Sequence, residues 1–241
     1  MLSLHSIRNL VSQGRKLSWA TKNYPSRGQT AVQELFQTPK GKLFLKRSSK
    51  QNHIDCQIEI KSGTIAQREY WAHCLAKELA LRVPDLWLLD DFTTVQVWFD
   101  LPDARQYATS QGKMLLEAET VFNCALFDWL TGQIDRHDAN YLYDYVNQSI
   151  VLIDSAHCFL KYTGSIPDYL RYFEIGYPRE LRKDRSTTTR DRLQSLTTEK
   201  LATIATLRNT EESWALHQRL EQLKPIKTIQ GIINLYRGVR P

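Results

Sequence analysis

The sequence predicts an α+β fold with two lobes, a small β-sheet that carries one helix and a mostly helical lobe that follows it. Two observations lead to this prediction. Short β-like runs surround one strong helical segment up to about residue 100, and helical periodicity dominates beyond it. The chain of 241 residues, of which 42% are hydrophobic and 24% charged, has the composition of a folded protein and the length for one large domain or two small lobes.

The first lobe is expected to span residues 1–100 and to begin with a polar, basic arm at residues 1–25. Two β-like runs follow at residues 31–37 and 42–46, on either side of the sequence TPKG. Proline at the second position and glycine at the fourth are typical of a β-turn. The two runs are therefore predicted to form a hairpin.

A helix is predicted over residues 64–82, a stretch rich in residues of high helix propensity. Ser62 and Thr64 are candidate N-caps, and Pro84 follows the predicted end. Strands are expected at residues 86–89 and 94–99, and a short one could lie at 56–60. These elements would complete the small sheet of the first lobe.

The second lobe is expected to span residues 101–241. Apolar residues recur at helical spacing from Leu115 onwards and predict an amphipathic helix that ends near Gly132. The other expected elements are a β-hairpin of residues 141–145 and 150–153 and a helical tail over residues 197–240 with a break at Pro225.

The charge balance favours anionic partners, because 32 basic and 26 acidic residues give a net charge of +6. The basic residues are dispersed, which disfavours a nucleic-acid-binding domain. No apolar run is long enough for a transmembrane segment, and the N-terminus lacks the pattern of a secretory signal, so we expect a cytoplasmic protein. The four cysteines are widely spaced and are expected to be reduced thiols rather than metal ligands.

The densest group of polar residues follows the predicted helix of the second lobe. Asp135 and Asn140 are five residues apart, and Asp154 comes 19 residues after Asp135, directly after the second strand of the predicted hairpin. Phosphoryl transfer requires a carboxylate to orient or deprotonate the attacking hydroxyl, and an amide oxygen and a second carboxylate to hold Mg²⁺. The order and spacing favour this chemistry over a simple polar loop, in which Asp and Asn are also common.

The first lobe supplies two further groups of the kind that phosphoryl transfer needs. Lys46 ends an apolar strand, where its ammonium could reach nucleotide phosphates. Glu69 lies on the predicted helix, on the same stripe as Ala72, Ala76 and Ala80. In the functional interpretation Glu69 positions Lys46; in the plain interpretation both are solvated surface residues. Lys61 is a rival for the lysine role, and Lys46 is preferred because its strand follows the hairpin turn.

Other residues complete the predicted site. A glycine-rich phosphate loop of the G-x-G-x-x-G type is missing from the sequence, and Gly28, within residues 26–30, is the candidate for covering the phosphates with backbone amides. Phe99 and Leu101, at the boundary between the two lobes, would meet the adenine of a bound nucleotide. His137 has no second His or Cys at zinc-ligand spacing, so a supporting role in its loop is preferred.

Three segments of the sequence resemble known families. FDWLTGQIDRHDAN, at residues 127–140, is similar to the catalytic segment of HipA-type serine/threonine kinases and of the phosphatidylinositol 3-/4-kinase group, two branches of the protein-kinase-like superfamily. QREYWAHCLAKELALRVPDLWLLDD, at residues 67–91, and VQVWFD, at residues 95–100, resemble the HipA-type pattern. The DRH sequence favours the lipid-kinase branch, whereas the other two segments favour the HipA-type branch.

The resemblance implies a two-lobed protein-kinase-like fold that binds ATP and Mg²⁺ in the cleft. It implies that Asp135 is the catalytic base, that His137 supports the loop or the transferring phosphate, and that Asn140 and Asp154 bind the metal. The implied activity is transfer of the γ-phosphoryl group to Ser or Thr of a protein, with a regulatory partner protein as a further implication. Alternatives are a phosphatidylinositol kinase-like enzyme and a non-catalytic scaffold with the same fold.

If the HipA-type resemblance is right, Ser26 or Thr30 in the segment with Gly28 becomes a candidate autophosphorylation site. We expect mass spectrometry to detect phosphate within residues 24–31 after incubation of the protein with ATP and Mg²⁺. A fully covered, unmodified peptide would exclude this site.

Overall fold

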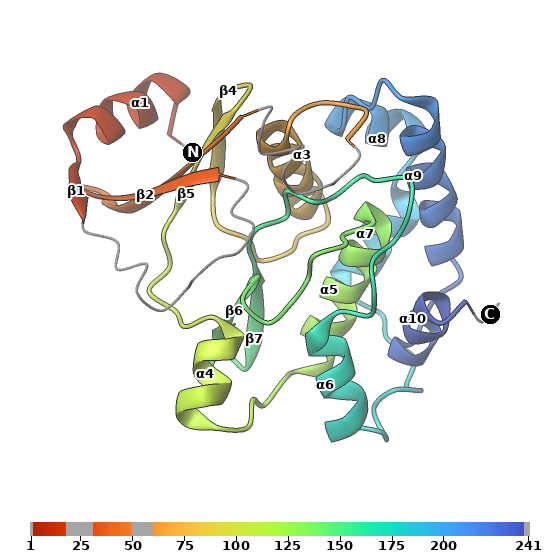
Figure 1. The fold of residues 1–241 in the computed structure, drawn as a ribbon. Coiled ribbons are helices and arrows are strands. Elements are labelled where there is room, and N and C mark those ends of the chain that lie inside the picture. Colours follow the sequence, from red (N-terminus) through yellow and green to blue (C-terminus); the bar gives the residue numbers. More distant parts are fainter. Residues whose placement is uncertain (1, 18–30, 50–59, 239–241) are drawn as a thin grey trace.

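An antiparallel sheet forms the first lobe of the computed structural model, which describes residues 2–17, 31–49 and 60–238 (Figure 1). This part, called the sheet lobe, comprises α1 (Leu4–Gln13), β1 (Arg15–Leu17), β2 (Ala31–Thr38), β3 (Gly41–Ser48), α3 (Ile65–Glu78), β4 (Leu86–Asp90) and β5 (Thr93–Val97). Its strands are arranged in the order β1-β2-β3-β5-β4.

The second part, called the helical lobe, is built around one buried helix. Its elements are α4 (Ala104–Gln111), α5 (Ala118–Thr131), β6 (Tyr141–Asp144), β7 (Ser149–Leu152), α6 (Asp168–Gly176), α7 (Thr188–Ser195), α8 (Thr198–Ile204), α9 (Thr210–Leu223) and α10 (Ile229–Tyr236). α5 packs against α6, α7, α9, α10 and β7, and ten of its 14 side chains are buried. The sequence predicts an amphipathic helix here, but the helix is buried on all sides from Cys124 onwards, as is expected at the centre of a core. The predicted α+β fold class with two lobes is confirmed.

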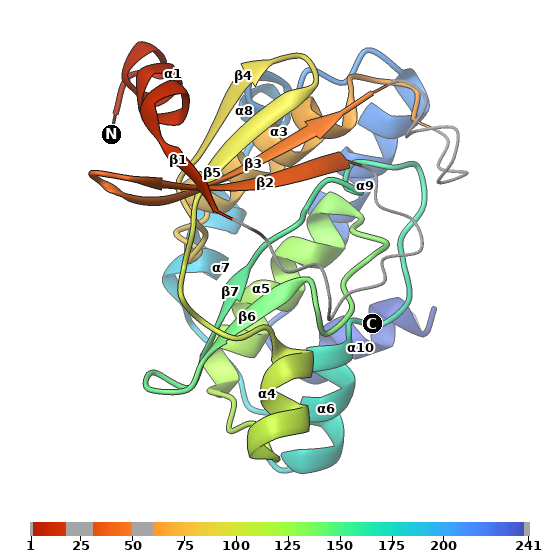
Figure 2. The same cartoon turned by 60° about the vertical axis from the view of Figure 1, so that its left-hand side comes forward.

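The side chains of β3 alternate between two environments, and this decides where Lys46 points. Leu43 and Leu45 belong to an apolar cluster with Ile7 of α1 and Val95 of β5. Lys46 lies one residue further and faces the opposite side of the sheet, where α3 packs. Figure 2 shows the sheet above the helical lobe, with α1 on its outer side.

α3 begins where the sequence predicts. The Thr64 hydroxyl accepts a hydrogen bond from the Gln67 N–H, and the Gln67 side chain accepts one from the Thr64 N–H, which makes a capping box. The helix ends at Glu78, so the predicted end at residue 82 is four residues too late. Ala80 adopts a left-handed conformation with φ of 58°, which stops the helix before proline is reached.

The predicted hairpins are present as β2–β3 and β6–β7, and the strands predicted after α3 correspond to β4 and β5. β1 and α4 are not predicted. β1 has only three residues and α4 is mostly polar, so neither has a clear hydrophobic period. The strand considered at residues 56–60 lies, except for residue 60, outside the described residues.

The predicted helical tail is divided into α8, α9 and α10, and Pro225 lies in the break between the last two. An additional break precedes α9 because Asn209 caps that helix, accepting hydrogen bonds from the N–H groups of Glu211 and Glu212. Within the described parts of the chain, no helix combines the length and the hydrophobicity needed to cross a bilayer.

His73 on α3 makes the stability of the fold depend on pH. Burial, and then the charge of Lys77, lower the pKa of His73 from 6.5 to about 4, against the smaller effects of Asp85 and Pro84. A group whose pKa is lower in the folded protein contributes stability that is complete above its unfolded pKa and is lost as the pH falls towards the folded value.

We therefore expect His73 to remove roughly 2–3 kcal/mol from the free energy of unfolding between pH 7 and pH 4.5. The His73→Gln variant lacks this imidazole. Its free energy of unfolding should therefore fall by roughly 2–3 kcal/mol less than that of the native protein over the same pH range. Urea denaturation at both pH values measures the difference. Equal losses in the two proteins would contradict the assignment.

Candidate active site

Lys46 and Glu69 meet because β3 and α3 present them to each other. The Lys46 Nζ atom is 2.6 Å from the Oε1 atom of Glu69. Thr94 lies directly opposite Lys46 in the β3–β5 register, and its hydroxyl donates to the Oε2 atom of Glu69 at 3.0 Å. Both oxygens of a carboxylate that is only 4% exposed are thus bonded. The predicted pairing of these two residues is present in the structure.

Asp154 joins this pair from the helical lobe. Its Oδ1 atom accepts a hydrogen bond from the Lys46 Nζ atom at 3.0 Å, so one ammonium is shared by carboxylates from both lobes. Asp154 has a φ of 51°, a left-handed conformation that costs energy for a residue with a side chain. The contact with Lys46 and a hydrogen bond to its carbonyl, described below, hold it there.

The electrostatics of this ion group favour the charged form of both partners. Burial would lower the pKa of Lys46, but the carboxylates of Asp154 and Glu69 outweigh this effect and raise the pKa above its ordinary value. Burial would raise the pKa of Asp154, but Lys46 and then His157 lower it. Lys46 and Asp154 are therefore both ionised at neutral pH.

Gln133 connects Asp154 to Asp135 in the loop that follows α5. Its side chain is buried; the amide donates to the Asp154 carbonyl at 3.2 Å, and the amide oxygen accepts from the Asp135 N–H at 3.1 Å. One side chain therefore bonds the backbones of both aspartates. This bridge is not predicted from the sequence.

Asp135 lies between two imidazoles. Its Oδ1 atom is 3.6 Å from the Nε2 atom of His137, and its Oδ2 atom is 3.4 Å from the Nδ1 atom of His157. The Asn140 amide donates to the Asp135 carbonyl at 2.7 Å and to Oδ2 at 3.3 Å. The Asp135 side chain is still 43% exposed. It is oriented by its neighbours and open to a substrate group.

The orientation of His137 follows from a backbone contact. The Ala139 N–H donates to the Nδ1 atom of His137 at 3.2 Å, so Nδ1 is an acceptor and the proton of a neutral ring lies on Nε2. That atom faces Asp135. This geometry allows His137 to support the Asp135 carboxylate.

Arg136 ties this loop to its surroundings. Its buried guanidinium donates to the Asp128 carboxylate of α5, to the Asn140 carbonyl at 2.6 Å and to the Ser155 hydroxyl at 2.8 Å. Tyr169 donates its hydroxyl to the same carboxylate at 2.9 Å. A buried ion pair adds little net stability, because desolvation offsets the attraction. What the pair provides is a fixed geometry for the loop.

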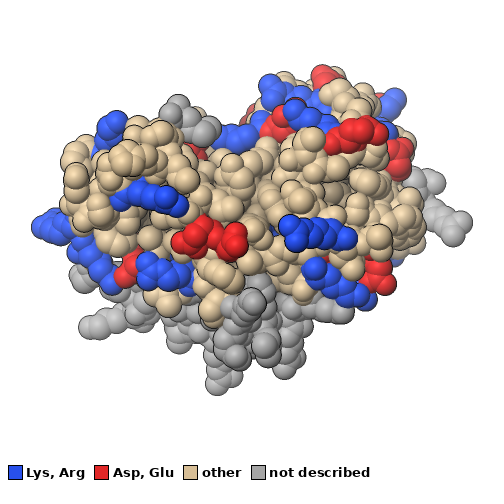
Figure 3. Space-filling model, turned by 90° about the horizontal axis from the view of Figure 1, so that it is seen from above, with Lys and Arg blue, Asp and Glu red and all other residues tan. Residues whose placement is uncertain are grey.

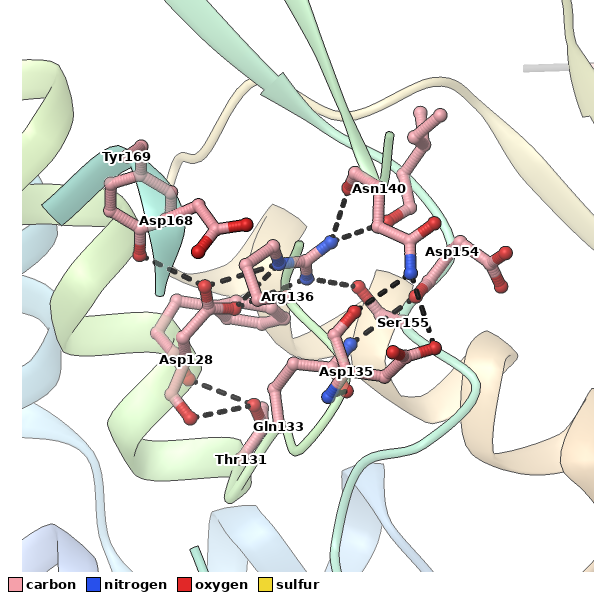
Figure 4. Close-up of polar contacts among 12 residues, drawn as sticks. Asp128, Thr131, Gln133, Asp135, Arg136, Asn140, Asp154, Ser155, Asp168 and Tyr169 are labelled. Atoms are coloured by element: carbon pink, nitrogen blue, oxygen red, sulfur yellow. Dashed lines mark hydrogen bonds and ion pairs between the residues drawn. The ribbon is translucent and has the colours of Figure 1, made fainter. Parts of the chain in front are cut away.

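Figure 4 shows how the polar groups are arranged around Arg136. Asp128 and Tyr169 lie on one side of Arg136, whereas the side chains of Asp135, Asn140 and Asp154 lie on the other. Three of the four residues predicted for catalysis and metal binding therefore lie on one side of a buried cation.

The residues predicted to hold Mg²⁺ suit that ion. The Asn140 nitrogen donates to Asp135, which leaves the amide oxygen as a possible ligand, and the Asp154 side chain is 37% exposed. The described residues form no cluster of three or more His, Cys, Asp or Glu that could hold a metal without help. Mg²⁺ characteristically uses one or two protein oxygens and takes its other ligands from phosphates and water.

Two cavities adjoin the Lys46–Glu69 pair. Both are bordered by Glu69 and Asp154. The lining of the first also includes Lys46, Gln33, Ser48, Ile65, Ala66, Phe92, Thr94 and Ala156. The second lies on the side of β4, and its lining includes Ala72, His73, Val83, Leu86, Phe127 and Leu152. The charged group thus lies between one space with a mixed polar and apolar lining and one mostly apolar space.

The other predicted residues do not join this group within the described part of the chain. Lys61 pairs with Glu211 of α9 at 2.9 Å, which leaves Lys46 as the lysine beside Asp154. Phe99 and Leu101 are half-buried after β5 and do not line the two cavities as the described residues form them. Gly28 lies outside the described residues, as do Ser26 and Thr30.

The charges on the molecular surface are mixed. On the face shown in Figure 3, Lys and Arg side chains lie among Asp and Glu side chains. Among the described residues, Lys77 pairs with Asp85 and Lys200 with Glu78. Solvent-exposed pairs of this kind contribute little to stability.

Neither a known protein family model nor a curated protein sequence matches the chain. Solved structures of kinase-like folds do align with it. The proinflammatory kinase CtkA of Helicobacter pylori is 13% identical, with 95% of this chain and 97% of that chain covered and a TM-score of 0.43. The Rio2 kinase of Chaetomium thermophilum, in a complex with ADP, Mg²⁺ and phosphoaspartate, is 13% identical, with 93% and 75% covered and a TM-score of 0.45.

The pseudokinase domain of BIR2, an immune regulator, also aligns, with 14% identity, coverage of 91% of this chain and 82% of that chain, and a TM-score of 0.34. The aligned structures thus include kinases and a pseudokinase. At such identities only this chain's own residues can support an activity.

Gly164 lets the segment after Asp154 lie directly on the loop that follows α5. A Cβ atom at this position would be 2.5 Å from the Ile134 Cα atom and 2.7 Å from the Gln133 carbonyl oxygen, both of them backbone atoms. We expect Gly164→Ala to lower the free energy of unfolding by about 1–3 kcal/mol, because the loop or the segment must shift.

Gly176→Ala is the matched control, because Gly176 ends α6 and a Cβ there would have no neighbour within 4 Å among the described residues. This variant should keep or slightly raise the stability. Urea denaturation compares the two. Similar stabilities would show that the close approach at Gly164 is not a constraint.

Proposed function

We propose that the protein is an ATP- and Mg²⁺-dependent kinase that transfers the γ-phosphoryl group of ATP to a hydroxyl group. One observation carries the proposal. Lys46, Glu69, Asp135, Asn140 and Asp154 come from four separate segments, and hydrogen bonds and ion pairs join them, with Gln133, into one group. Phosphoryl transfer is the chemistry that uses a lysine with a carboxylate partner, a carboxylate base and an amide–carboxylate pair together.

In the proposed reaction the acceptor oxygen attacks the γ-phosphorus while the bond from this phosphorus to the β–γ bridging oxygen breaks, which leaves ADP. Asp135 accepts the hydroxyl proton. Lys46, oriented by Glu69, binds the α- and β-phosphates. Asn140 and Asp154 hold Mg²⁺, which when bound neutralises phosphate charge.

The backbone around Gly28 would cover the phosphates, and the segment from Phe99 to Leu101 would meet the adenine. The proposed acceptor is Ser or Thr of a protein, because the HipA-type resemblance covers two separate segments of the sequence. The basic net charge keeps a phosphoinositide as the alternative acceptor.

The test is phosphate transfer from γ-labelled ATP with Mg²⁺, offered separately to the protein alone, to a protein extract and to vesicles that contain phosphoinositides. We expect label on protein. Asp135→Asn should reduce the rate about 10²–10⁴-fold while ATP binding persists, because this residue acts on the acceptor proton. Asp154→Ala should lose both the activity and the Mg²⁺ dependence of ATP binding.

Asp138→Asn provides a matched control in the same loop, because the Asp138 carboxylate pairs with Arg105 of α4 instead of joining the group around Asp135. This variant should keep most of the activity. Label in the lipid fraction would favour the phosphoinositide alternative. Mg²⁺-dependent ATP binding without transfer to any fraction would indicate a missing substrate or activator. A protein that does not bind ATP would refute the proposal in favour of the scaffold.

A further inference from the structure

α3, which carries Glu69, is attached to the helical lobe through Arg68. The Arg68 side chain is fully buried, and its Nη2 atom is 2.6 Å from the Oε1 atom of Glu212 on α9. Its Nε atom donates to the Ser62 carbonyl at 2.9 Å, and its Nη1 atom donates to the Cys158 carbonyl at 2.6 Å. One guanidinium therefore bonds the entry to α3, the segment after Asp154 and the start of α9.

Two backbone groups strengthen the same junction. The Lys61 N–H donates to the Oε1 atom of Glu212 at 3.1 Å, and the Asn209 N–H donates to the Ser62 hydroxyl at 2.9 Å. The start of α9 is thus hydrogen-bonded to the segment that leads into α3. Contacts from α8 to α3 extend the junction along the helix.

Net stability does not explain this buried pair. The Oε2 atom of Glu212 is buried and has no hydrogen-bond partner among the described residues. An incompletely bonded buried carboxylate costs free energy, and apolar side chains of similar size would remove that cost. Fixing the relative position of two elements is the best-supported use of such a pair.

The element that is fixed here is the one that the nucleotide site needs. Arg68 precedes Glu69, so α3 directs the first side chain to α9 and the second to β3. The two neighbouring residues therefore hold the helix at both lobes. A rotation or shift of α3 that separated Glu69 from Lys46 would also have to break the buried contacts of Arg68.

We propose that Arg68 and Glu212 are positioning residues that hold α3, and with it Glu69, in place to orient Lys46. The C-terminal helices thereby form part of the machinery of the nucleotide site. The effect on nucleotide affinity rests on the proposed function, whereas the effect on α3 does not.

The first measurement needs no variant. Native-state hydrogen exchange at increasing denaturant should show the amides of α3 and α9 opening together as one cooperative unit. If the α3 amides instead open at lower denaturant with the sheet while α9 stays closed, the proposal is wrong.

The second measurement uses Arg68→Met/Glu212→Met, which removes both charges and leaves neither one buried alone. We expect the α3 amides to exchange about tenfold faster relative to those of α5. The dissociation constant for ATP with Mg²⁺ should rise by a similar factor, because apparent affinity scales with the population of the competent state.

Two control variants separate positioning from general destabilisation. Arg219→Met removes a buried arginine of α9, the helix that carries Glu212. The Arg219 guanidinium donates to the Leu130 and Leu160 carbonyls, not to α3. Glu211→Gln removes the exposed carboxylate beside Glu212. Neither should speed the exchange of the α3 amides themselves, whereas Arg219→Met can speed that of α5, whose Leu130 carbonyl loses a donor. If Arg219→Met speeds the exchange of the α3 amides as much as the double variant does, Arg68 contributes only to general stability and the positioning role is wrong.

If the native protein does not bind ATP with Mg²⁺, the proposed function fails, and the exchange of α3 still decides the role of Arg68 and Glu212. If it binds ATP and the double variant keeps both native α3 protection and native affinity, the positioning role alone is refuted.

Discussion

The shared ammonium of Lys46 is the interaction on which the rest of the site depends. It bonds Glu69 of α3 and Asp154 after β7, so one charge connects the sheet, its helix and the helical lobe. An ammonium buried without partners would lose its proton or be driven to the surface. The two carboxylates avoid this, and the placement of β3, α3 and the end of β7 is therefore constrained together.

Buried arginines extend the same principle beyond the cleft. Arg136 joins α5, the loop that carries Asp135 and Asn140, and the segment after Asp154, and Arg68 joins that segment to α3 and α9. Each guanidinium offers several donors in a rigid plane and can satisfy carbonyls from different segments at once. Loops that carry functional side chains are thereby held by the helices behind them.

The local patterns of the sequence account for much of the fold. The capping box at Thr64, the hairpin turns and the apolar helix α5 depend on neighbouring residues, so they are visible without a structure. β1 is too short to show a period, and it forms by pairing with β2. The early end of α3 depends on the left-handed Ala80, which no residue type at that position announces.

For the site, the sequence by itself determined the residue types and their order: a lysine on a strand, a glutamate on a helix, and Asp135, Asn140 and Asp154 at fixed spacing around a hairpin. Only the tertiary structure decided that Lys46 rather than Lys61 lies beside Asp154, and that Gln133, His157 and Arg68 belong to the supporting network. The physical reason is distance along the chain. Lys46 and Asp154 are 108 positions apart, and Arg68 and Glu212 are 144 apart, so no local pattern can report their contact.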